Sequence, residues 1–280
     1  MAASRRKLPF WRRGTLRAKL DITKLRPKHL ARGKRFETLD DVREESVRSE
    51  ELLDAYRPNN AQSIYLRECR EGYYQCDRTY CPRCARKFRR RLTGELLRLN
   101  SRFNNPVSIL TVLLESASRD KLLDLKIERY RHSLRKRLDR AGLGGVPVVG
   151  GFEMIYRTRT KEWMLHINLV VFGGNEKAIL KFERGFSDGE IDRPVQRAAL
   201  VHKAKQLSYI LKFTTYHRPY GQRGRTKSKA LPLNPAEHYA LVNWMDQHEF
   251  PDYLFLFNAR RRGAIIELGN KASTREALNA

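Results

Sequence analysis

The chain has 280 residues, of which 41% are hydrophobic, enough to bury a large core in one large domain or two smaller ones. Its 57 lysines and arginines against 31 acidic residues give a formal charge of +26 and an isoelectric point near 10.3. This excess is beyond what solubility requires and predicts a polyanionic partner. Because basic residues spread along the whole chain and no run of 18 apolar residues occurs, we expect nucleic acid and no membrane.

The first twenty residues are basic but lack the continuous apolar segment of about 7–15 residues that a signal peptide contains. We therefore expect a cytoplasmic protein, with an organellar transit peptide as the alternative. In a reducing compartment, four clustered cysteines indicate a metal site rather than disulfides.

The N-terminal part predicts a basic arm followed by helices. Residues 37–56 have helical apolar spacing, and turn formers within residues 57–69 introduce a candidate short strand. Residues 85–103 predict a strongly basic helix with an apolar stripe, well placed to lie along phosphates.

The middle of the chain predicts a sheet. Residues 105–116 are rich in branched apolar side chains and predict a buried strand, and residues 118–142 predict an amphipathic helix that stops at Gly142. Residues 144–157 and 163–173 predict two strands of a hairpin.

The C-terminal part predicts a helix over residues 193–213 and a Gly- and Lys-rich loop over 216–239. A short helix over 236–249 and a hairpin over 253–268 follow. The element order is α+β with antiparallel pairing.

We divide the chain into four parts: a basic arm and helix over 1–60, a zinc-binding module and basic helix over 61–100, a core over 101–220, and a basic loop, helix and hairpin over 221–280.

All four cysteines fall within sixteen residues, at Cys69, Cys76, Cys81 and Cys84. The final Cys-Pro-Arg-Cys can place two thiolates on one tetrahedral ion within a tight turn. Zinc suits four soft thiolates, and a closed four-sulfur site leaves no position for substrate, so we expect a structural Zn²⁺. Unliganded thiols, a redox site or a fourth ligand other than Cys69 are the alternatives.

His166 and Asn168 lie two residues apart in a predicted strand and so share a face. If the preceding strand pairs with this one, Glu153 reaches the same patch. Imidazole nitrogen with amide and carboxylate oxygens suits Mg²⁺ or Mn²⁺. The alternative is a hydrogen-bonded histidine on a half-exposed strand, with asparagine beside it.

Lys205, Tyr209 and Lys212 have the spacing of one helix face. Positive charge beside a phenol favours the phenolate, which is the better nucleophile toward a phosphodiester. The alternative is a tyrosine at the edge of a buried helix face.

Together these residues resemble the HUH endonuclease superfamily, in particular rolling-circle replication initiators of plasmids and phages and the related single-strand transposases. Members carry a His-hydrophobic-His strand, a carboxylate on a neighbouring strand, and a downstream Tyr-x-x-Lys helix. Several initiators also have an upstream Cys-Pro-x-Cys element. The matching stretches here are residues 153–171, Tyr-Ile-Leu-Lys-Phe at 209–213, and Cys-Pro-Arg-Cys, in the family's order.

The resemblance implies a small antiparallel sheet flanked by helices and a transesterification. Tyr209 would attack a DNA phosphodiester, leaving a 5′-phosphotyrosine and a free 3′-OH, with Lys212 steadying the phosphate or phenolate. Glu153, His166 and Asn168 would hold the catalytic Mg²⁺ or Mn²⁺. The partner would be single-stranded or hairpin origin DNA.

Two departures from the family pattern keep a second function open. Asn168 replaces the second histidine, and Phe213 stands where a second tyrosine often occurs. A catalytically degenerate DNA-binding regulator, either a repressor or an origin-binding protein, therefore fits as well. An RNA-binding protein of ribosomal type fits the charge and the cysteines but not the His166 and Tyr209 arrangement. The basic residues expected to contact nucleic acid are Arg86, Lys87, Arg89, Arg90, Arg91, Lys205, Arg223, Arg225, Arg260, Arg261 and Arg262.

Overall fold

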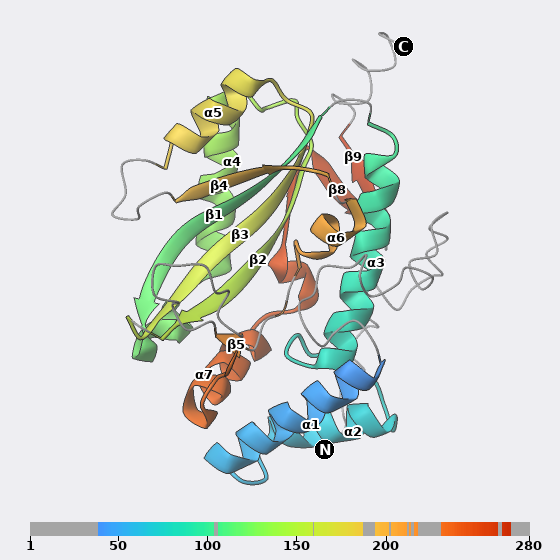
Figure 1. Cartoon of the computed structure of the whole chain (residues 1–280), viewed down its shortest axis with the longest axis vertical. Helices are drawn as coiled ribbons and strands as arrows, with labels where there is room; N and C mark the ends of the chain where they lie inside the picture. The colour runs from blue at the N-terminus through green and yellow to red at the C-terminus, as the bar shows by residue number, and fades with distance from the viewer. Residues whose placement is uncertain are drawn as a thin grey trace.

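The computed structural model describes residues 39–103, 106–158, 160–186, 194–201, 203–211, 213, 216–217, 231–262 and 265–269. The predicted α+β class is confirmed: a five-stranded antiparallel sheet is flanked by helices (Figure 1). Among the described residues, no helix has the length and apolar character needed to cross a bilayer. The basic arm and most of the predicted Gly- and Lys-rich loop lie outside the described residues.

Helices occur where the sequence predicts them over 37–56, 85–103, 118–142 and 236–249, whereas the helix over 176–184 was not predicted. The helices are α1 (Leu39–Tyr56), α2 (Ala61–Glu71), α3 (Pro82–Asn100), η4 (Arg119–Asp124), α4 (Ile127–Ala141), α5 (Glu176–Arg184), α6 (Lys203–Ser208), α7 (Pro235–Asp246) and η5 (Phe250–Tyr253). As predicted, α4 ends at Gly142, which adopts a left-handed φ of 89° that glycine tolerates without strain.

The central sheet has the strand order β4-β1-β3-β2-β7. Its strands are β1 (Val107–Ser118), β2 (Val148–Arg157), β3 (Glu162–Phe172), β4 (Val195–Ala199) and β7 (Leu254–Phe257). Two smaller pairs are β5 (Tyr216–His217) with β6 (Leu231–Pro232), and β8 (Ala259–Arg262) with β9 (Ile265–Leu268). The predicted hairpin of β2 and β3 is confirmed and occupies the middle of the sheet, where side chains are buried on both faces.

Helices cover the two faces of this sheet. In Figure 1, α4 lies behind the sheet and α5 lies beside the upper end of α4, whereas α6 lies in front of the sheet, between β2 and the long helix α3. Arg135 of α4 lies 5.8 Å from the ring of Phe255, and Phe255 pairs with Gly150. Because neighbouring residues of a strand point to opposite faces, α4 covers the face opposite that of Gly151 and Glu153.

Three predictions of local structure are wrong. Residues 61–71 form helix α2 rather than a strand. The side chain of Asn60 caps this helix by accepting a 2.9 Å hydrogen bond from the amide of Ser63. Buried Ser63, Leu66 and Cys69 recur every three residues, which is a helical period. The strand was predicted because the segment also contains β-branched Ile64 and aromatic Tyr65.

The helix predicted over 193–213 is a strand followed by a short helix. β4 pairs with the outer edge of β1, and among the described residues of this range the helix is limited to Lys203–Ser208. Without β4, backbone groups at the outer edge of β1 would lack hydrogen-bond partners. The bonds that β4 makes to them outweigh the helical propensity of its alanines. Similarly, the hairpin predicted over 253–268 divides: β7 joins the edge of the central sheet beside β2, and β8 and β9 form the hairpin.

Candidate functional site

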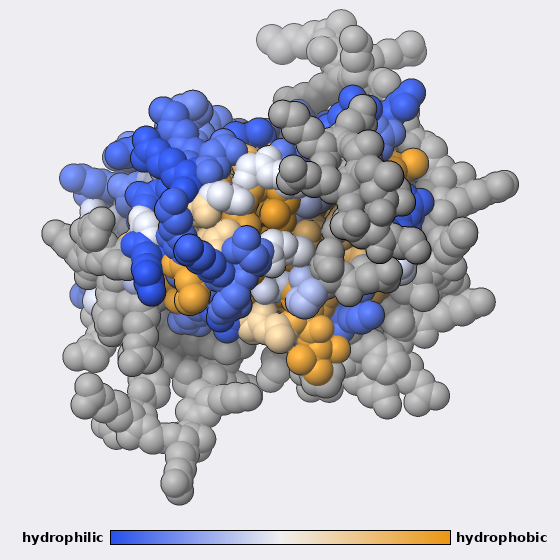
Figure 2. Space-filling view, turned by 90° about the horizontal axis from the view of Figure 1, so that it is seen from above, coloured by the Kyte–Doolittle hydropathy of each residue, from blue (hydrophilic) through white to orange (hydrophobic). Residues whose placement is uncertain are grey.

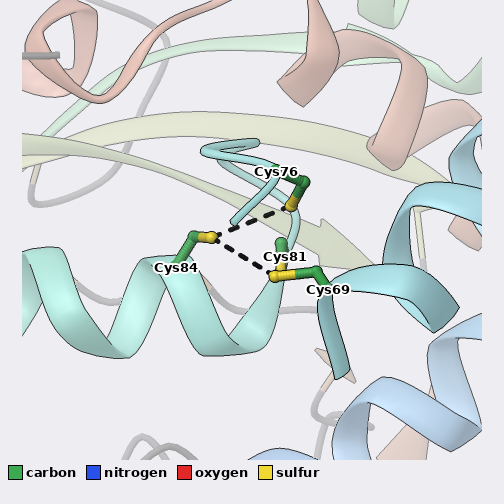
Figure 3. Close-up of side chains that lie close together, drawn as sticks. All are labelled: Cys69, Cys76, Cys81 and Cys84. Atoms are coloured by element: carbon green, nitrogen blue, oxygen red, sulfur yellow. Dashed lines mark hydrogen bonds between the residues drawn. The ribbon is translucent and has the colours of Figure 1, made fainter. Parts of the chain in front are cut away.

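The four cysteines come from the end of one helix, the start of the next and the loop between them. Cys69 lies in the last turn of α2, Cys76 in the loop, Cys81 at the cap of α3 and Cys84 in its first turn (Figure 3). Gly72 ends α2 with a left-handed φ of 91°, which turns the chain back toward α3. Pro82 in the first turn of α3 suits a helix start, because that position has no amide partner within the helix.

The sulfur positions fit a tetrahedral metal site. Sγ of Cys84 lies 3.8 Å from that of Cys69 and 3.7 Å from that of Cys76, and Sγ of Cys81 lies 3.7 Å from that of Cys69. A tetrahedron with zinc–sulfur bonds of about 2.3 Å has edges of about 3.8 Å. All four ligand atoms lie within 4.8 Å of one another. The cysteines could therefore bind a metal such as zinc.

The short distances between the sulfurs make the ionisation of neighbouring thiols interdependent. Hydrogen bonding to Cys76 and the other two thiols lowers the pKa of Cys69. Hydrogen bonding to Cys69 raises the pKa of Cys81 and that of Cys84. One thiolate is thus stabilised at the expense of its neighbours, and an ion at the centre removes this competition.

The cysteine loop is anchored to the C-terminal helix α7. Thr79 donates a 2.6 Å hydrogen bond to the carbonyl of Met245, and Arg78 forms a 2.9 Å ion pair with Asp246. The side chain of Arg83 also donates to the carbonyl of Cys69. The cluster is therefore part of the folded body rather than a separate appendage.

The second constellation lies on the two central strands. Glu153 of β2 pairs directly with His166 of β3, and Gly151 pairs with Asn168. Oε2 of Glu153 lies 3.0 Å from Nε2 of His166 and accepts a 3.3 Å hydrogen bond from Nδ2 of Asn168. The structure thus brings together the three side chains that the sequence predicts to converge.

The cluster is buried and hydrogen-bonded within itself. Glu153 and His166 are each 3% exposed, and Asn168 is 1% exposed. Oδ1 of Asn168 accepts a 2.8 Å hydrogen bond from the hydroxyl of Thr111. The amide oxygen therefore faces Thr111 rather than Glu153, and a cation between Glu153 and His166 requires the Asn168 amide to turn around.

The donor set is weaker than that of the cysteines. Among the described residues, the four cysteines are the one group of three or more His, Cys, Asp or Glu side chains close enough to share an ion. The cluster of Glu153, His166 and Asn168 offers one carboxylate and one imidazole, with an amide as third donor. Nδ1 of His166 is buried without a hydrogen-bond partner.

The segment that carries Tyr209 packs over this same face of the sheet. A Cβ atom on Gly151 would lie 2.3 Å from the carbonyl oxygen of Ile210 and 2.5 Å from Cδ2 of Leu211. Gly151 lies two residues from Glu153 on the same face, about 7 Å along the strand. Only a glycine permits this approach, so Gly151 is a site residue that the sequence analysis missed.

Tyr209 itself projects outward. Ser208, Ile210 and Leu211 are buried, whereas Tyr209 is 39% exposed. It follows the last residue of α6, and its amide donates a 3.1 Å hydrogen bond to the carbonyl of Gln206. The predicted face of Lys205, Tyr209 and Lys212 on one helix is therefore wrong, because the helix ends at Ser208. Lys212 and the side chain of Lys205 lie outside the described residues.

Phe213 is part of the core. Its ring lies 6.4 Å from that of Phe88, 5.3 Å from that of Phe250 and 5.2 Å from that of Tyr253. The position at which the sequence resemblance expects a second tyrosine is therefore a packing position here, and it is 6% exposed.

The predicted nucleic-acid-binding residues of α3 are less exposed than a free basic face would be. Arg89 is buried, and Lys87 donates a 2.6 Å hydrogen bond to Gln75. Arg86, Arg90 and Arg91 are half-buried. Partial burial lowers the pKa of Arg91.

The arginines of β8 are exposed but partly neutralised. Arg260 forms a 3.1 Å ion pair with Glu267, and Arg262 lies 3.6 Å from the same carboxylate. Burial lowers the pKa of Arg261. The remaining predicted contacts, Arg223 and Arg225, lie outside the described residues.

Sequence signals for two further residues of the site were present. Thr111 is the one hydroxyl within the apolar stretch 109–114, and it supports Asn168 from β1. The pair Gly150–Gly151 follows Val148 and Val149 within the strand, and glycine inside a strand marks a close approach of another backbone. Comparisons with protein-family models, curated proteins and solved structures give no match to this chain.

Proposed function

We propose that the protein binds DNA and nicks and rejoins single strands through Tyr209, in the manner of the HUH endonucleases that its motifs resemble. The observation that carries this proposal is the meeting of Glu153, His166 and Asn168 on one sheet face, under the segment that presents Tyr209. The formal charge of +26 supports a polyanionic substrate.

The proposed step is a transesterification that conserves the phosphodiester energy. The phenol oxygen of Tyr209 attacks the phosphorus, a tyrosine–phosphate bond forms, and the bond to the 3′ oxygen breaks. The phenol proton passes to the departing 3′ oxygen, which leaves as a hydroxyl. Mg²⁺ or Mn²⁺ held by Glu153, His166 and Asn168 would neutralise charge on the scissile phosphate.

The chain's own residues have positioning roles in this step. Ile210 and Leu211 fix the height of the Tyr209 backbone above Gly151. Thr111 and Glu153 orient Asn168, and Glu153 orients the ring of His166. We further propose that the four cysteines hold a structural Zn²⁺, because four sulfurs fill its coordination and leave no open position.

The burial of the cluster favours a second candidate, a DNA-binding regulator without catalysis. Glu153, His166 and Asn168 are nearly inaccessible, and the carboxylate of Glu153 is hydrogen-bonded to both of the other side chains. In that function they act as a polar network that stabilises the centre of the sheet.

A covalent-adduct assay separates the two functions. Purified protein is incubated with Mn²⁺ and a panel of single-stranded and hairpin oligonucleotides, then denatured and resolved by electrophoresis. Nicking predicts a slower DNA-linked band that requires metal and is absent in Tyr209→Phe. The matched control Tyr73→Phe removes an exposed hydroxyl elsewhere and keeps the band.

The outcomes decide between the candidates. A metal-dependent adduct that survives Tyr209→Phe refutes Tyr209 as nucleophile. DNA binding with no adduct on any oligonucleotide favours the regulator. Since Tyr209 is partly exposed, its conversion to phenylalanine should leave the melting temperature unchanged, and thermal unfolding confirms that the variant is folded.

A further inference from the structure

A second basic surface lies between α4 and α5. An open groove of about 580 Å³ runs between these helices. Its basic lining residues, here called the rear groove cations, are Arg129, Lys136, Arg137, Arg140 and Lys181. Figure 2, which looks onto the end of the molecule that carries α5, shows mostly hydrophilic residues on the left, with hydrophobic residues reaching the surface in smaller areas.

The pattern of α4 explains why these cations form a stripe. Leu134 and Leu138 are buried against the body of the protein, as are Ile127 and Ala141. Positions 129, 136 and 140 lie seven and four residues apart, which places them on one opposite face of the helix. From position 129 to 140 the helix rises about 16 Å, comparable with the axial rise of about five base pairs of DNA.

The rear groove cations have no ion-pair partner within the described part of the chain. None forms an ion pair with a described residue, and no carboxylate lines the groove. The acidic side chains of α5 are engaged elsewhere: Glu176 and Glu183 lie 2.6 Å and 3.4 Å from the guanidinium of Arg197 on β4. The positive charge of the groove is therefore available to a ligand.

One of these cations is held in place. The guanidinium of Arg137 lies 4.4 Å from the centroid of the Phe186 ring. Stacking on an aromatic face limits the rotamers of an arginine while leaving its edge free to donate hydrogen bonds. A pre-positioned guanidinium loses less entropy when it binds a phosphate.

We propose that the rear groove binds the phosphate backbone of duplex DNA, separately from the DNA that reaches Tyr209. α4 covers the sheet face opposite that of Glu153, and the segment carrying Tyr209 covers the face of Glu153. One DNA segment cannot lie in the groove and at the candidate site without wrapping around the sheet. This goes beyond the proposed nicking and holds for the regulator as well.

The lining favours a duplex backbone over other polyanions. The lining contains no tyrosine or tryptophan, and its one phenylalanine, Phe182, is 1% exposed and offers no face on which an unpaired base could stack; the exposed imidazole of His132 is the one ring that remains there. The lining also offers no exposed apolar side chain to insert into a bilayer. Contacts to phosphates alone predict binding that is independent of base sequence and steeply dependent on salt.

The test compares two double charge reversals with the same change in net charge. Lys136→Glu/Arg140→Glu alters the rear groove, and Arg43→Glu/Lys121→Glu alters exposed positions on α1 and η4. Binding to a short duplex of arbitrary sequence is measured by fluorescence anisotropy between about 50 and 200 mM salt. Each lost phosphate contact lowers the slope of log K against log salt by about 0.9, so the groove variant should lose about 1.8 and bind at least tenfold more weakly.

Every result bears on the proposal. An equal loss in the control variant, or an unchanged slope in the groove variant, overturns it. Retained duplex binding together with lost binding to vesicles of anionic phospholipid assigns the groove to a membrane instead. The groove variant should still form the Tyr209 adduct on a short single strand, and Tyr209→Phe should still bind duplex, so failure of one proposal is distinguishable from failure of the other.

Discussion

The substitution Gly151→Ala tests the contact on which the candidate site depends. The new methyl group would lie 2.3 Å from the carbonyl oxygen of Ile210, whereas real contacts of this kind are essentially never below 3.0 Å. The segment 209–211 must therefore move away from Glu153 by at least several tenths of an ångström. Overpacking of this kind costs about 1–3 kcal/mol, and the lower chain entropy of alanine offsets about 0.4–1 kcal/mol.

We expect a net loss of about 1–2 kcal/mol in the free energy of unfolding, or roughly 2–8 °C in melting temperature for a protein of this size. Hydrogen exchange in residues 203–211 should become faster than in the unaltered protein. If the proposed nicking is right, adduct formation by folded protein should also fall, because Tyr209 is displaced from the cluster.

Gly150→Ala is the matched control for this substitution. Its methyl group would lie 2.5 Å from Cδ2 of Leu169 and 2.9 Å from the carbonyl oxygen of Asn168, on the opposite face of the sheet. It should destabilise the fold while leaving exchange in residues 203–211 unchanged. If the rate of hydrogen exchange in residues 203–211 is the same in both variants, the packing argument for Tyr209 is refuted.

Three further predictions concern the metal, the pH and the aromatic core. A strong chelator should release about one zinc per chain and lower the melting temperature, and Cys84→Ser should prevent the release by preventing binding; metal analysis and thermal unfolding check both. Burial lowers the pKa of His238 to about 3, so the unfolded chain binds more protons below pH 6.5, and the free energy of unfolding should fall by about 2 kcal/mol from pH 7 to pH 5. In His238→Leu, denaturant titrations should show a flatter pH dependence. Phe213→Tyr should cost about 1–3 kcal/mol, since its hydroxyl enters a buried aromatic cluster, and should give no second adduct.

The sequence predicted the parts of the fold in which one strong period dominates. The alternation around His166 and the turn before it were sufficient to place Glu153 opposite, and the register confirms that pairing. The amphipathic pattern of α4 likewise set its end at Gly142. The spacing of the cysteines predicted their convergence without any knowledge of the sheet.

The remaining features depend on contacts that distant segments make. Residues 195–199 show no alternation of polar and apolar side chains that would predict a strand. They form β4 because they can hydrogen-bond to the backbone at the outer edge of β1. Tyr209 does not share a helix face with Lys205, because the helix ends at Ser208 and the residues after it pack over Gly151. This end also depends on a contact between distant segments. The burial of Glu153 could not be predicted either, because the side chains that line the space beside it, among them Phe213, Trp244 and Tyr253, come from distant parts of the chain.

The short span of the cysteine ligands has a consequence for the order of assembly. All four sulfurs belong to a stretch of sixteen residues, so closing the chain around an ion costs little loop entropy. The central sheet, in contrast, requires β2 and β7 to pair although about a hundred residues separate them in the sequence. Convergence of the four cysteines should therefore precede completion of the sheet during synthesis, and it sets the start of α3 before most of the residues that α3 packs against have been made.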